Sequence, residues 1–348
     1  MDRYNIVQKT VMAIFLAGVV MLVIIPLLYF TTVAFSSAVE MSQFPKHIFP
    51  SMTVTVKIVP TEDGEFELFH DRGDDRGYRS VITTADPERL EIHFKRQYNV
   101  NLSGAELIRD FSRTFTEGPL ELTYRKQTLY NFFQFFKIVN KAAPALKNSI
   151  IVSLLTILIS LTLGSMAGFA MARYNFPFKE KINLGILIVR MFPVVGISIP
   201  MAKQLIRFGL FDTQIGLALL YSVPNIALTA WITSSIFIGI NREMEEASYI
   251  FGANGFQTFL KITLPLAFPA MAASSMYAFN TAWNDTISAL ILTNRNQTLS
   301  LVVYKAIGTT SSGIQYAAAG SIILILPALV FTLIVRRYIN EMWGSAKL

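Results

Sequence analysis

Long apolar runs limit most strongly what this chain can fold into, because a helix that crosses a bilayer needs about 20 consecutive apolar residues. Six runs reach that length: residues 11–35, 150–171, 183–204, 213–240, 266–293 and 317–335. The chain is 53% hydrophobic and its mean hydropathy is +0.46, which is too apolar for a soluble globular domain. The sequence therefore predicts an all-α polytopic membrane protein with six transmembrane helices.

The first apolar run can be interpreted as a secretory signal or as an uncleaved helix. A secretory signal has an apolar core of only about 7–15 residues, and residues 11–35 are longer than that. We therefore expect a polar N-terminal segment at 1–10 and a first transmembrane helix at 11–35. The third run contains Pro193 and Pro200, and we expect its helix to be broken at both.

Residues 36–147 differ in character from the rest of the chain. Within them, residues 51–126 are rich in charges and turns, and they predict a small α+β domain inserted between the first two helices. The expected elements are strands at 52–59, 79–84 and 89–96 and a helix at 103–115. Residues 148–348 then form a core of five further helices.

The distribution of Lys and Arg predicts the orientation in the membrane. If the N-terminus is cytoplasmic, the inner segments are residues 1–10, 172–183, 240–264 and 336–348. These segments hold ten Lys and Arg, whereas the two short outer connections at 205–213 and 294–316 hold three. We therefore expect both termini in the cytoplasm and residues 36–147 on the extracytoplasmic side.

Several function classes are disfavoured by what the sequence lacks. It contains no cysteine and no phosphate-binding motif of the form GxxxxGK[ST], so any ATP that drives it must bind to another chain. The net charge of +7 fits lysines and arginines in cytoplasmic loops better than nucleic-acid binding. His47, His70 and His93 are too far apart for a local metal motif, so no metal site and no catalytic site is predicted.

The segment at 241–265, between the fourth and fifth apolar runs, is charged and helix-forming. Asn241 is a good N-cap, and acidic residues follow in the first turns, where the helix dipole favours negative charge. Ala247 and Ser248 are small enough to let another surface approach closely. Gly252 is expected to end this helix before a second one begins near Phe256.

This loop resembles the cytoplasmic loop of ABC-importer permeases, whose pattern is Glu-Ala-Ala, Gly and then Ile-x-Leu-Pro. The pattern is matched at Glu246, Ala247, Gly252, Ile262, Leu264 and Pro265. The departures are Ser248 for the second alanine and Phe251 where the family often has aspartate. The resemblance implies that a short helix docks into a cleft of an ATPase, and we therefore call residues 241–265 the coupling loop. The implied ATPase-coupling residues are Glu245, Glu246, Ala247, Ser248, Gly252, Leu264 and Pro265.

Apart from Lys203 at the very end of the third run, two charged residues fall within the predicted membrane helices. Arg190 lies in the third and Asp285 in the fifth, directly after Trp283 and Asn284. An ionised group at a helix centre costs about 2.5–3.5 kcal/mol on insertion scales, so such groups usually face a bundle interior or water. One interpretation is that these four residues line a translocation path for a sugar; the other is that they pair with neighbouring helices and serve assembly.

The segments around Arg190 and Trp283 also resemble the carbohydrate-uptake branch of ABC-importer permeases, akin to the maltose-system inner subunit. Within the tail at 338–348, residues 343–348 resemble the Gly-x-x-Lys-Gly ending of sugar permeases of that branch, without its last glycine, although a frayed terminus is an equal alternative. Whether the tail reaches the ATPase stays open.

The resemblance implies a multi-pass permease of a bacterial or archaeal cytoplasmic membrane that imports a di- or oligosaccharide. Its implied partners are a second, non-identical permease subunit, an ATPase dimer that binds ATP and Mg, an extracytoplasmic solute-binding protein and membrane lipid. An ABC permease for glycerophosphodiester, polyol or peptide and, beyond that, a secondary carrier remain as alternatives.

Overall fold

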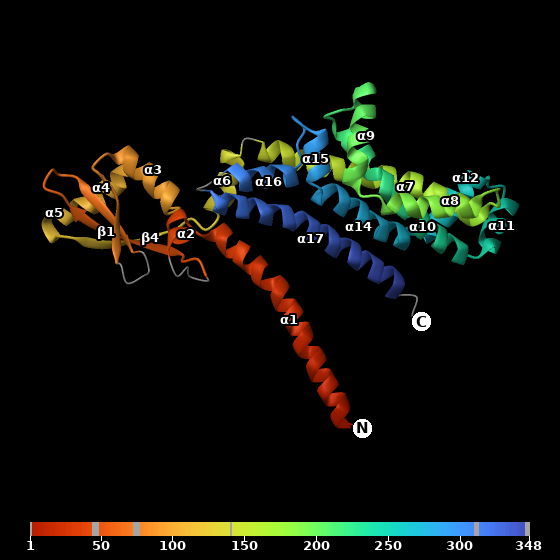
Figure 1. The fold of residues 1–348 in the computed structure, drawn as a ribbon, viewed down its shortest axis with the longest axis horizontal. Coiled ribbons are helices and arrows are strands. Elements are labelled where there is room, and N and C mark those ends of the chain that lie inside the picture. The colour runs from red at the N-terminus through yellow and green to blue at the C-terminus, as the bar shows by residue number, and fades with distance from the viewer. Residues whose placement is uncertain (1, 44–48, 72–76, 140, 310–312, 345–348) are drawn as a thin grey trace. The chain divides into compact units, whose positions relative to one another are not determined.

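The computed structural model describes residues 2–43, 49–71, 77–139, 141–309 and 313–344. The chain divides into two compact units (Figure 1). One comprises residues 1–139 with 306–323, and the other comprises residues 140–305 with 324–348. We call them the α+β unit and the helical unit.

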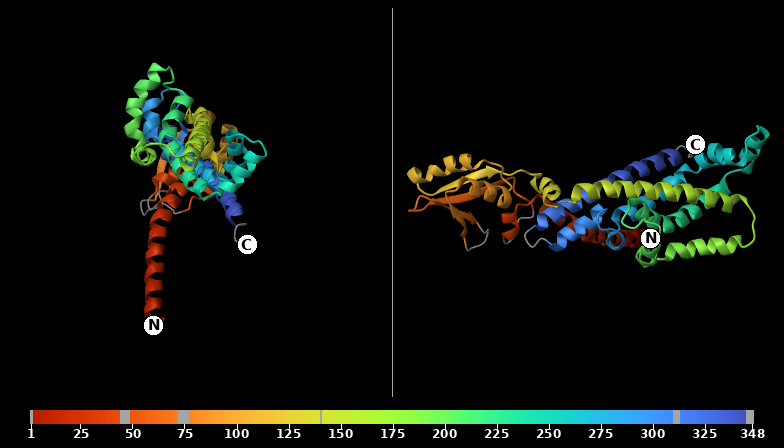
Figure 2. Two further views of the ribbon diagram at one scale, coloured as in Figure 1. Left: turned by 90° about the vertical axis from the view of Figure 1, so that its right-hand side faces the viewer. Right: turned by 90° about the horizontal axis from the view of Figure 1, so that it is seen from above.

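The helical unit is built around two long parallel helices, α7 (Ala142–Arg173) and α10 (Gln214–Gly239), which pack side by side (Figures 1 and 2). A Cβ added to Gly164 would lie 2.5 Å from Thr229 Cβ, and one added to Gly168 would lie 2.1 Å from Thr233 Oγ1. The two backbones therefore approach as closely as glycine allows, as the run of small residues at this face predicts.

The remaining helices of this unit are shorter or bent. They are α8 (Lys179–Met191), α9 (Val194–Arg207), α11 (Arg242–Ile250), α12 (Gly255–Thr258), a π-helix (Phe259–Thr263), α13 (Leu264–Leu266), α14 (Phe268–Asn284) and α15 (Ile287–Leu292). Two helices run through both units, α16 (Leu299–Thr309) and α17 (Ile314–Gly344).

Four described helices are long and apolar enough to cross a membrane, and six spans result if each bent pair is counted as one. The bent pairs are α8 with α9, at 97°, and residues 255–266 with α14, at 77°. The expected break at Pro193 is present, because proline forces Phe192 into extended backbone with ψ 128°. The break expected at Pro200 is wrong, since Pro200 lies inside α9. The fifth predicted helix is also not continuous: α14 ends at Asn284, and Asp285 is extended with ψ 131°.

The α+β unit begins with the end of α1 (Asp2–Phe35) and α2 (Ala38–Ser42). Its sheet consists of β1 (Thr53–Pro60), β2 (Phe66–Asp71), β3 (Tyr78–Thr84) and β4 (Leu120–Arg125), in the antiparallel order β3-β2-β1-β4. The helices α3 (Pro87–Gln97), α4 (Gly104–Ser112) and α5 (Thr114–Glu117) separate β3 from β4, and α6 (Tyr130–Ile138) follows.

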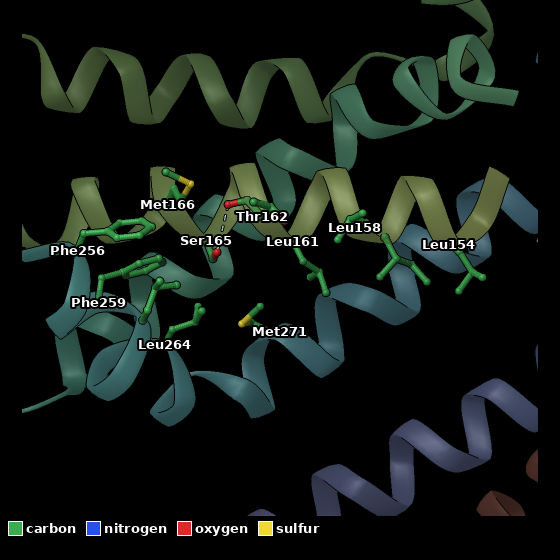
Figure 3. A pocket seen from close by; sticks show the side chains of 12 residues that line it. Leu154, Leu158, Leu161, Thr162, Ser165, Met166, Phe256, Phe259, Leu264 and Met271 are labelled. Carbon is green, nitrogen blue, oxygen red and sulfur yellow. Dashed lines mark hydrogen bonds between the residues drawn. The ribbon is translucent and has the colours of Figure 1, made fainter. Parts of the chain in front are cut away.

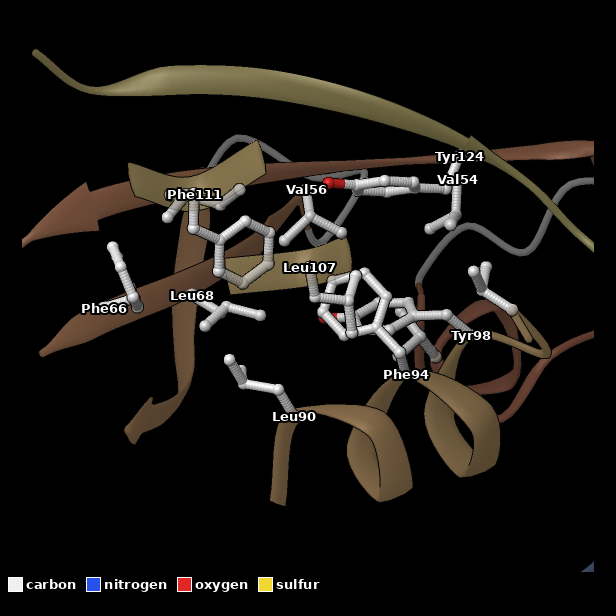
Figure 4. Close-up of a cluster of buried hydrophobic side chains, with 13 residues drawn as sticks. Val54, Val56, Phe66, Leu68, Leu90, Phe94, Tyr98, Leu107, Phe111 and Tyr124 are labelled. Atoms are coloured by element: carbon white, nitrogen blue, oxygen red, sulfur yellow. The ribbon is translucent and has the colours of Figure 1, made fainter. Parts of the chain in front are cut away.

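The core of this unit is formed between the sheet and its helices (Figure 4). Val54, Val56 and Ile58 alternate along β1 toward Leu90 and Phe94 of α3. The strand expected at 89–96 is therefore wrong. The Asp86 side chain accepts a hydrogen bond from the Glu88 N–H, and Pro87 follows the cap, so the segment begins a helix whose i, i+4 residues are buried.

Two polar clusters join α1 to the rest of its unit. Asn131 donates from Nδ2 to the carbonyl oxygens of Ala34 and Ser36, both at 2.8 Å. Glu40 forms a buried ion pair with Lys126, with Oε1 2.6 Å from Nζ. The unit thus continues from the end of α1 into the sheet through hydrogen bonds as well as through the chain.

Candidate functional site

The coupling loop leaves α10 at Ile240 and folds into two short helices joined by a tight turn. The Asn241 side chain accepts a hydrogen bond from the Glu243 N–H at 3.1 Å, which starts α11. Gly252 has φ +82°, the left-handed conformation that ends many helices. Asn254 and Gln257 then form a reciprocal capping box at the start of α12. The helix-ending glycine is where the sequence predicts it.

Glu245 lies on the inner face of α11, where its carboxylate is held by the end of α7. Arg173 donates from Nε to both carboxylate oxygens at 2.9 Å, and its Nη2 lies 2.8 Å from Oε1. Thr263 Oγ1 donates to the same Oε1 at 3.0 Å. Both charged side chains are over 90% buried. Glu245 therefore faces the chain's own helices, and any part that it plays in coupling is played through Arg173.

A second inward contact lies one turn further along α11. Ser248 Oγ and Thr258 Oγ1 are 2.7 Å apart, and Ser248 also donates to the carbonyl oxygen of Glu245 at 2.6 Å. Both side chains are buried. This contact ties α11 to α12 across the turn, so Ser248 also holds the loop together internally.

Three aromatic side chains pack together where the coupling loop meets α7 and α10. Phe169 of α7, Phe237 of α10 and Phe259 of the π-helix are all buried. The Phe169 ring centroid lies 5.7 Å from that of Phe237 and 4.9 Å from that of Phe259. Together with the Arg173–Glu245 ion pair, this cluster fixes the loop to both long helices.

The outer face of α11 is open and partly apolar. Glu246 and Ala247 are exposed, as are Tyr249, Ile250 and Phe251. Ile250 is 85% exposed and Phe251 is 90% exposed. Phe251 is also the residue at which the loop departs from the resembled pattern. We call these five residues the outer face of the loop.

Leu264 and Pro265 close the loop, and both are half-buried. Leu264 lies on an apolar groove of about 520 Å³ whose other wall is α7 (Figure 3). Figure 3 shows Phe256, Phe259 and Leu264 lining it opposite Leu154 and Leu158. Such a lining suits lipid or a packing helix better than a hydrophilic solute.

Trp283 is placed in the helical unit with its indole ring covered. It is 1% exposed, its Nε1 donates to the carbonyl oxygen of Leu324 at 2.8 Å, and its ring stacks on Phe279 at 5.2 Å. Phe279 in turn stacks on Phe331 at 4.3 Å. These contacts favour the assembly interpretation for Trp283.

Asp285 lies at the break between α14 and α15 and is held by three donors. Its Oδ2 accepts from Tyr221 OH at 2.9 Å, from Ser288 N at 2.9 Å and from Ala289 N at 3.4 Å. The carboxylate thus starts α15 and links it to α10. Asn284, next to it, is exposed.

Arg190 lies near the end of α8 and is exposed in the described structure. Of the four residues predicted to line a path, Trp283, Asn284 and Asp285 are adjacent in sequence. Only Asn284 and Arg190 present exposed side chains, whereas Trp283 and Asp285 bond within the fold.

Sequence reasoning missed two sets of polar residues. Arg173 was considered only as a positive charge in a loop, although its place at the end of an apolar run opposite an acidic helix could have indicated a partner. Asp212, which has φ +57°, accepts from the N–H groups of Asn294, Arg295 and Asn296 at 2.9 to 3.1 Å. Burial alone would raise the pKa of Asp212, but these N–H groups outweigh it and lower the pKa.

Comparison with known proteins places this geometry in context. A sequence model of the family described as "Binding-protein-dependent transport system inner membrane component" matches residues 160–342, more than half of the chain. The trehalose transport system permease protein SugB of Mycobacterium tuberculosis is 36% identical over 201 residues, which is 57% of this chain and 73% of the relative. The trehalose/maltose transport system permease protein MalG of Thermococcus litoralis is 30% identical over 230 residues, which is 65% of this chain and 82% of the relative.

A solved structure is also similar in fold over almost all of the chain. It is the crystal structure of a bacterial ABC transporter involved in the import of the acidic polysaccharide alginate, with a TM-score of 0.61 and 17% identity. The match covers 97% of this chain and 98% of that chain.

Proposed function

The chain belongs to the family of inner membrane components of binding-protein-dependent transport systems, as its coupling loop predicts, and we propose that it is a permease subunit of an ATP-driven sugar importer. Relatives named for trehalose and maltose transport support a di- or oligosaccharide as the solute. The observation that carries the proposal is the coupling loop, with an exposed outer face on a helix locked to α7 by a buried ion pair.

The proposed arrangement has six spans, with each bent helix pair crossing once, and both termini in the cytoplasm. Tail residues 345–348 lie outside the described residues, so the expectation about the tail stays a prediction. In this orientation the coupling loop faces the cytoplasm and residues 36–147, between the first two spans, face the opposite side. The coupling loop and residues 36–147 therefore meet different partners.

On the cytoplasmic side, the partner is an ATPase dimer that binds ATP and Mg. On the other side it is a solute-binding protein, and within the membrane it is a second, non-identical permease subunit with the surrounding lipid. ATP closes the ATPase dimer, whose cleft pulls α11 through Glu246, Ala247 and the apolar residues beside them. Because Arg173 and the aromatic cluster fix α11 to α7 and α10, the pull moves those helices and opens the path.

We assign the translocation path to Asn284, at the end of α14, and to Arg190, near the end of α8. Asn284 and Arg190 have exposed side chains that can meet a solute, whereas Trp283 and Asp285 shape the break by their internal contacts. An anionic solute would bind more strongly to Arg190 than to Asn284, because the guanidinium forms charge-assisted hydrogen bonds.

The first test replaces the apolar outer face. The double variant Ile250→Ser with Phe251→Ser changes two side chains that touch water, so the chain should fold and reach the membrane normally. Stimulation of ATP hydrolysis by the solute-binding protein, and sugar uptake in proteoliposomes, should fall to background. The matched control is Phe133→Ser on α6, which also removes an exposed phenylalanine and should leave both activities intact.

A second test concerns Gly252. A Cβ added there meets nothing within 4 Å, so only its left-handed backbone opposes substitution. Gly252→Val should abolish uptake, whereas Gly252→Asn, which tolerates that conformation, should retain more of it. Normal uptake in the serine double variant and in Gly252→Val would refute the assignment of the loop. If the ATPase subunits co-purify but the solute-binding protein selects a polyol, peptide or glycerophosphodiester, the solute assignment is replaced.

A further inference from the structure

A polar groove of about 640 Å³ lies within the α+β unit, away from the residues that the proposed function uses. Its walls come from α2, α3, α6 and the start of α17, all of which belong to this unit. Figure 1 shows α2, α3 and α6 by label. The volume is within the range of about 300–1,000 Å³ that is typical of small-molecule sites.

The groove is positively charged. Lys95 and Arg96, adjacent on α3, line it, and the described lining contains no aspartate or glutamate. Arg96 is exposed and Lys95 is half-buried, so both charges remain hydrated and available. A guanidinium binds carboxylates and phosphates through paired hydrogen bonds, so the groove suits an anionic ligand.

The neutral lining favours a hydroxyl-rich ligand over a simple anion. Tyr130 and Tyr316 contribute aromatic rings with hydroxyl groups, and Gln134 and Gln315 contribute carboxamides. Tyr130 is hydrogen-bonded to Gln134, and Tyr316 to Gln315, and sugar hydroxyls can extend such pairs because they both donate and accept. Burial raises the pKa of Tyr130 to about 12, so its hydroxyl remains a donor at neutral pH.

We propose that this groove is a binding subsite for an acidic saccharide, with Arg96 and Lys95 at its carboxylate and the tyrosines and carboxamides at its rings and hydroxyls. The inference rests on the proposed function, because it takes the occupant to be a carbohydrate presented to the permease. It adds a second recognition point, on the α+β unit, and a preference for uronate-type sugars.

The test measures binding without transport. The full chain with its co-purified subunits is placed in phosphatidylcholine nanodiscs, without nucleotide or solute-binding protein, and radiolabelled digalacturonate is titrated by equilibrium dialysis. Digalacturonate should bind more tightly than maltose. Arg96→Gln should weaken its binding at least about tenfold, because a charge-assisted hydrogen bond is lost. Arg96→Lys should retain part of the affinity, and Gln134→Leu should weaken the binding of both sugars.

The matched control is Lys137→Gln, which removes the same charge from the exposed surface of α6 and should leave binding unchanged. Equal binding by wild type and Arg96→Gln, no binding by wild type, or equal affinity for maltose would each overturn the proposal. So would complete competition by inorganic phosphate, or loss of binding in phosphatidylglycerol nanodiscs, which would assign the groove to a free anion or to a lipid headgroup.

Uptake measured in parallel separates this inference from the proposed function. If Arg96→Gln binds digalacturonate normally and sugar uptake persists, the subsite proposal is wrong and the permease assignment stands. Arg96-dependent binding in a chain that moves no sugar supports the subsite and contradicts the permease assignment.

Discussion

Two largely buried ion pairs link segments that lie far apart in the sequence, and they are built differently. In the α+β unit, Lys126 meets Glu40, whose carboxylate also accepts from the N–H groups of Ser37 at 2.7 Å and Ser51 at 2.9 Å. In the helical unit, Arg173 pairs with Glu245. The Arg173 guanidinium also donates a hydrogen bond to the carbonyl oxygen of Ile240 at 3.1 Å. Each pair links residues more than 70 positions apart.

The two pairs differ in how many hydrogen-bond partners the remaining charged side chain keeps when the other member is removed. Without Lys126, the Glu40 carboxylate keeps two backbone donors. Without Glu245, the Arg173 guanidinium is left buried with one carbonyl acceptor. Burial also lowers the pKa of Lys126 against the opposing effect of Glu40, whereas an arginine stays charged at any ordinary pH. We therefore expect the loss of one partner to cost more stability in the Arg173–Glu245 pair than in the Lys126–Glu40 pair.

The largest effect is expected from Glu245→Ala. Removing one partner of a buried pair costs about 3–5 kcal/mol, so the loop should detach from α7. Thermal unfolding in detergent should show the loss of stability, and sugar uptake should fall to background. Glu243→Ala, an exposed acid on the same turn, should change stability by less than about 0.5 kcal/mol.

The double variant Arg173→Met with Glu245→Met distinguishes a buried charge from a general packing defect. Replacing both ions by apolar side chains restores much of the stability lost in the single variant. If the double variant is no more stable than Glu245→Ala, the unpaired guanidinium is not the cause.

A smaller loss is expected from Lys126→Met. Because Glu40 retains its backbone donors, the cost should be about 1–3 kcal/mol. Hydrogen exchange of the sheet amides should report it, with uptake much less affected. Arg125→Met, the exposed neighbour on β4, serves as the control. A loss equal to that of Glu245→Ala would contradict the comparison.

The smallest change is expected at Tyr98, whose hydroxyl is fully buried and has no hydrogen-bond partner in the part of the chain that the structure describes. Tyr98→Phe should stabilise the α+β unit by up to about 1 kcal/mol. Burial raises the pKa of Tyr98, so unfolding releases a proton above pH of about 10 and stability falls as the pH rises.

Tyr98→Phe should therefore weaken this alkaline loss of stability, as measured by unfolding between pH 8 and 11, which brackets the ordinary tyrosine pKa of about 10. At neutral pH, Tyr78→Phe should instead destabilise the α+β unit, because it removes the hydrogen bond that the Tyr78 hydroxyl donates to Glu121 at 2.7 Å. Equal alkaline curves for wild type and Tyr98→Phe would show that the hydroxyl is not buried in solution.

The long helices and the turn at Gly252 were predictable because apolar length and a left-handed glycine are local properties. Tertiary contacts decided the rest. The segment 89–96 alternates like a strand, but Asp86 and Pro87 make it a helix. Pro200 stays helical where Pro193 does not. That Glu245 and Ser248 point inward could not be read from the motif, because the residues that hold them, Arg173 and Thr258, are identified only by the fold.

The most direct test of the coupling loop uses the absence of cysteine from the sequence. Ala247→Cys places one exposed thiol on α11 in a background that needs no other change. A membrane-impermeant maleimide should fail to label it from outside intact cells. It should label the thiol in inside-out membranes stripped of ATPase subunits, and returning those subunits should block it. Labelling from outside, or labelling unaffected by the ATPase subunits, would contradict the account.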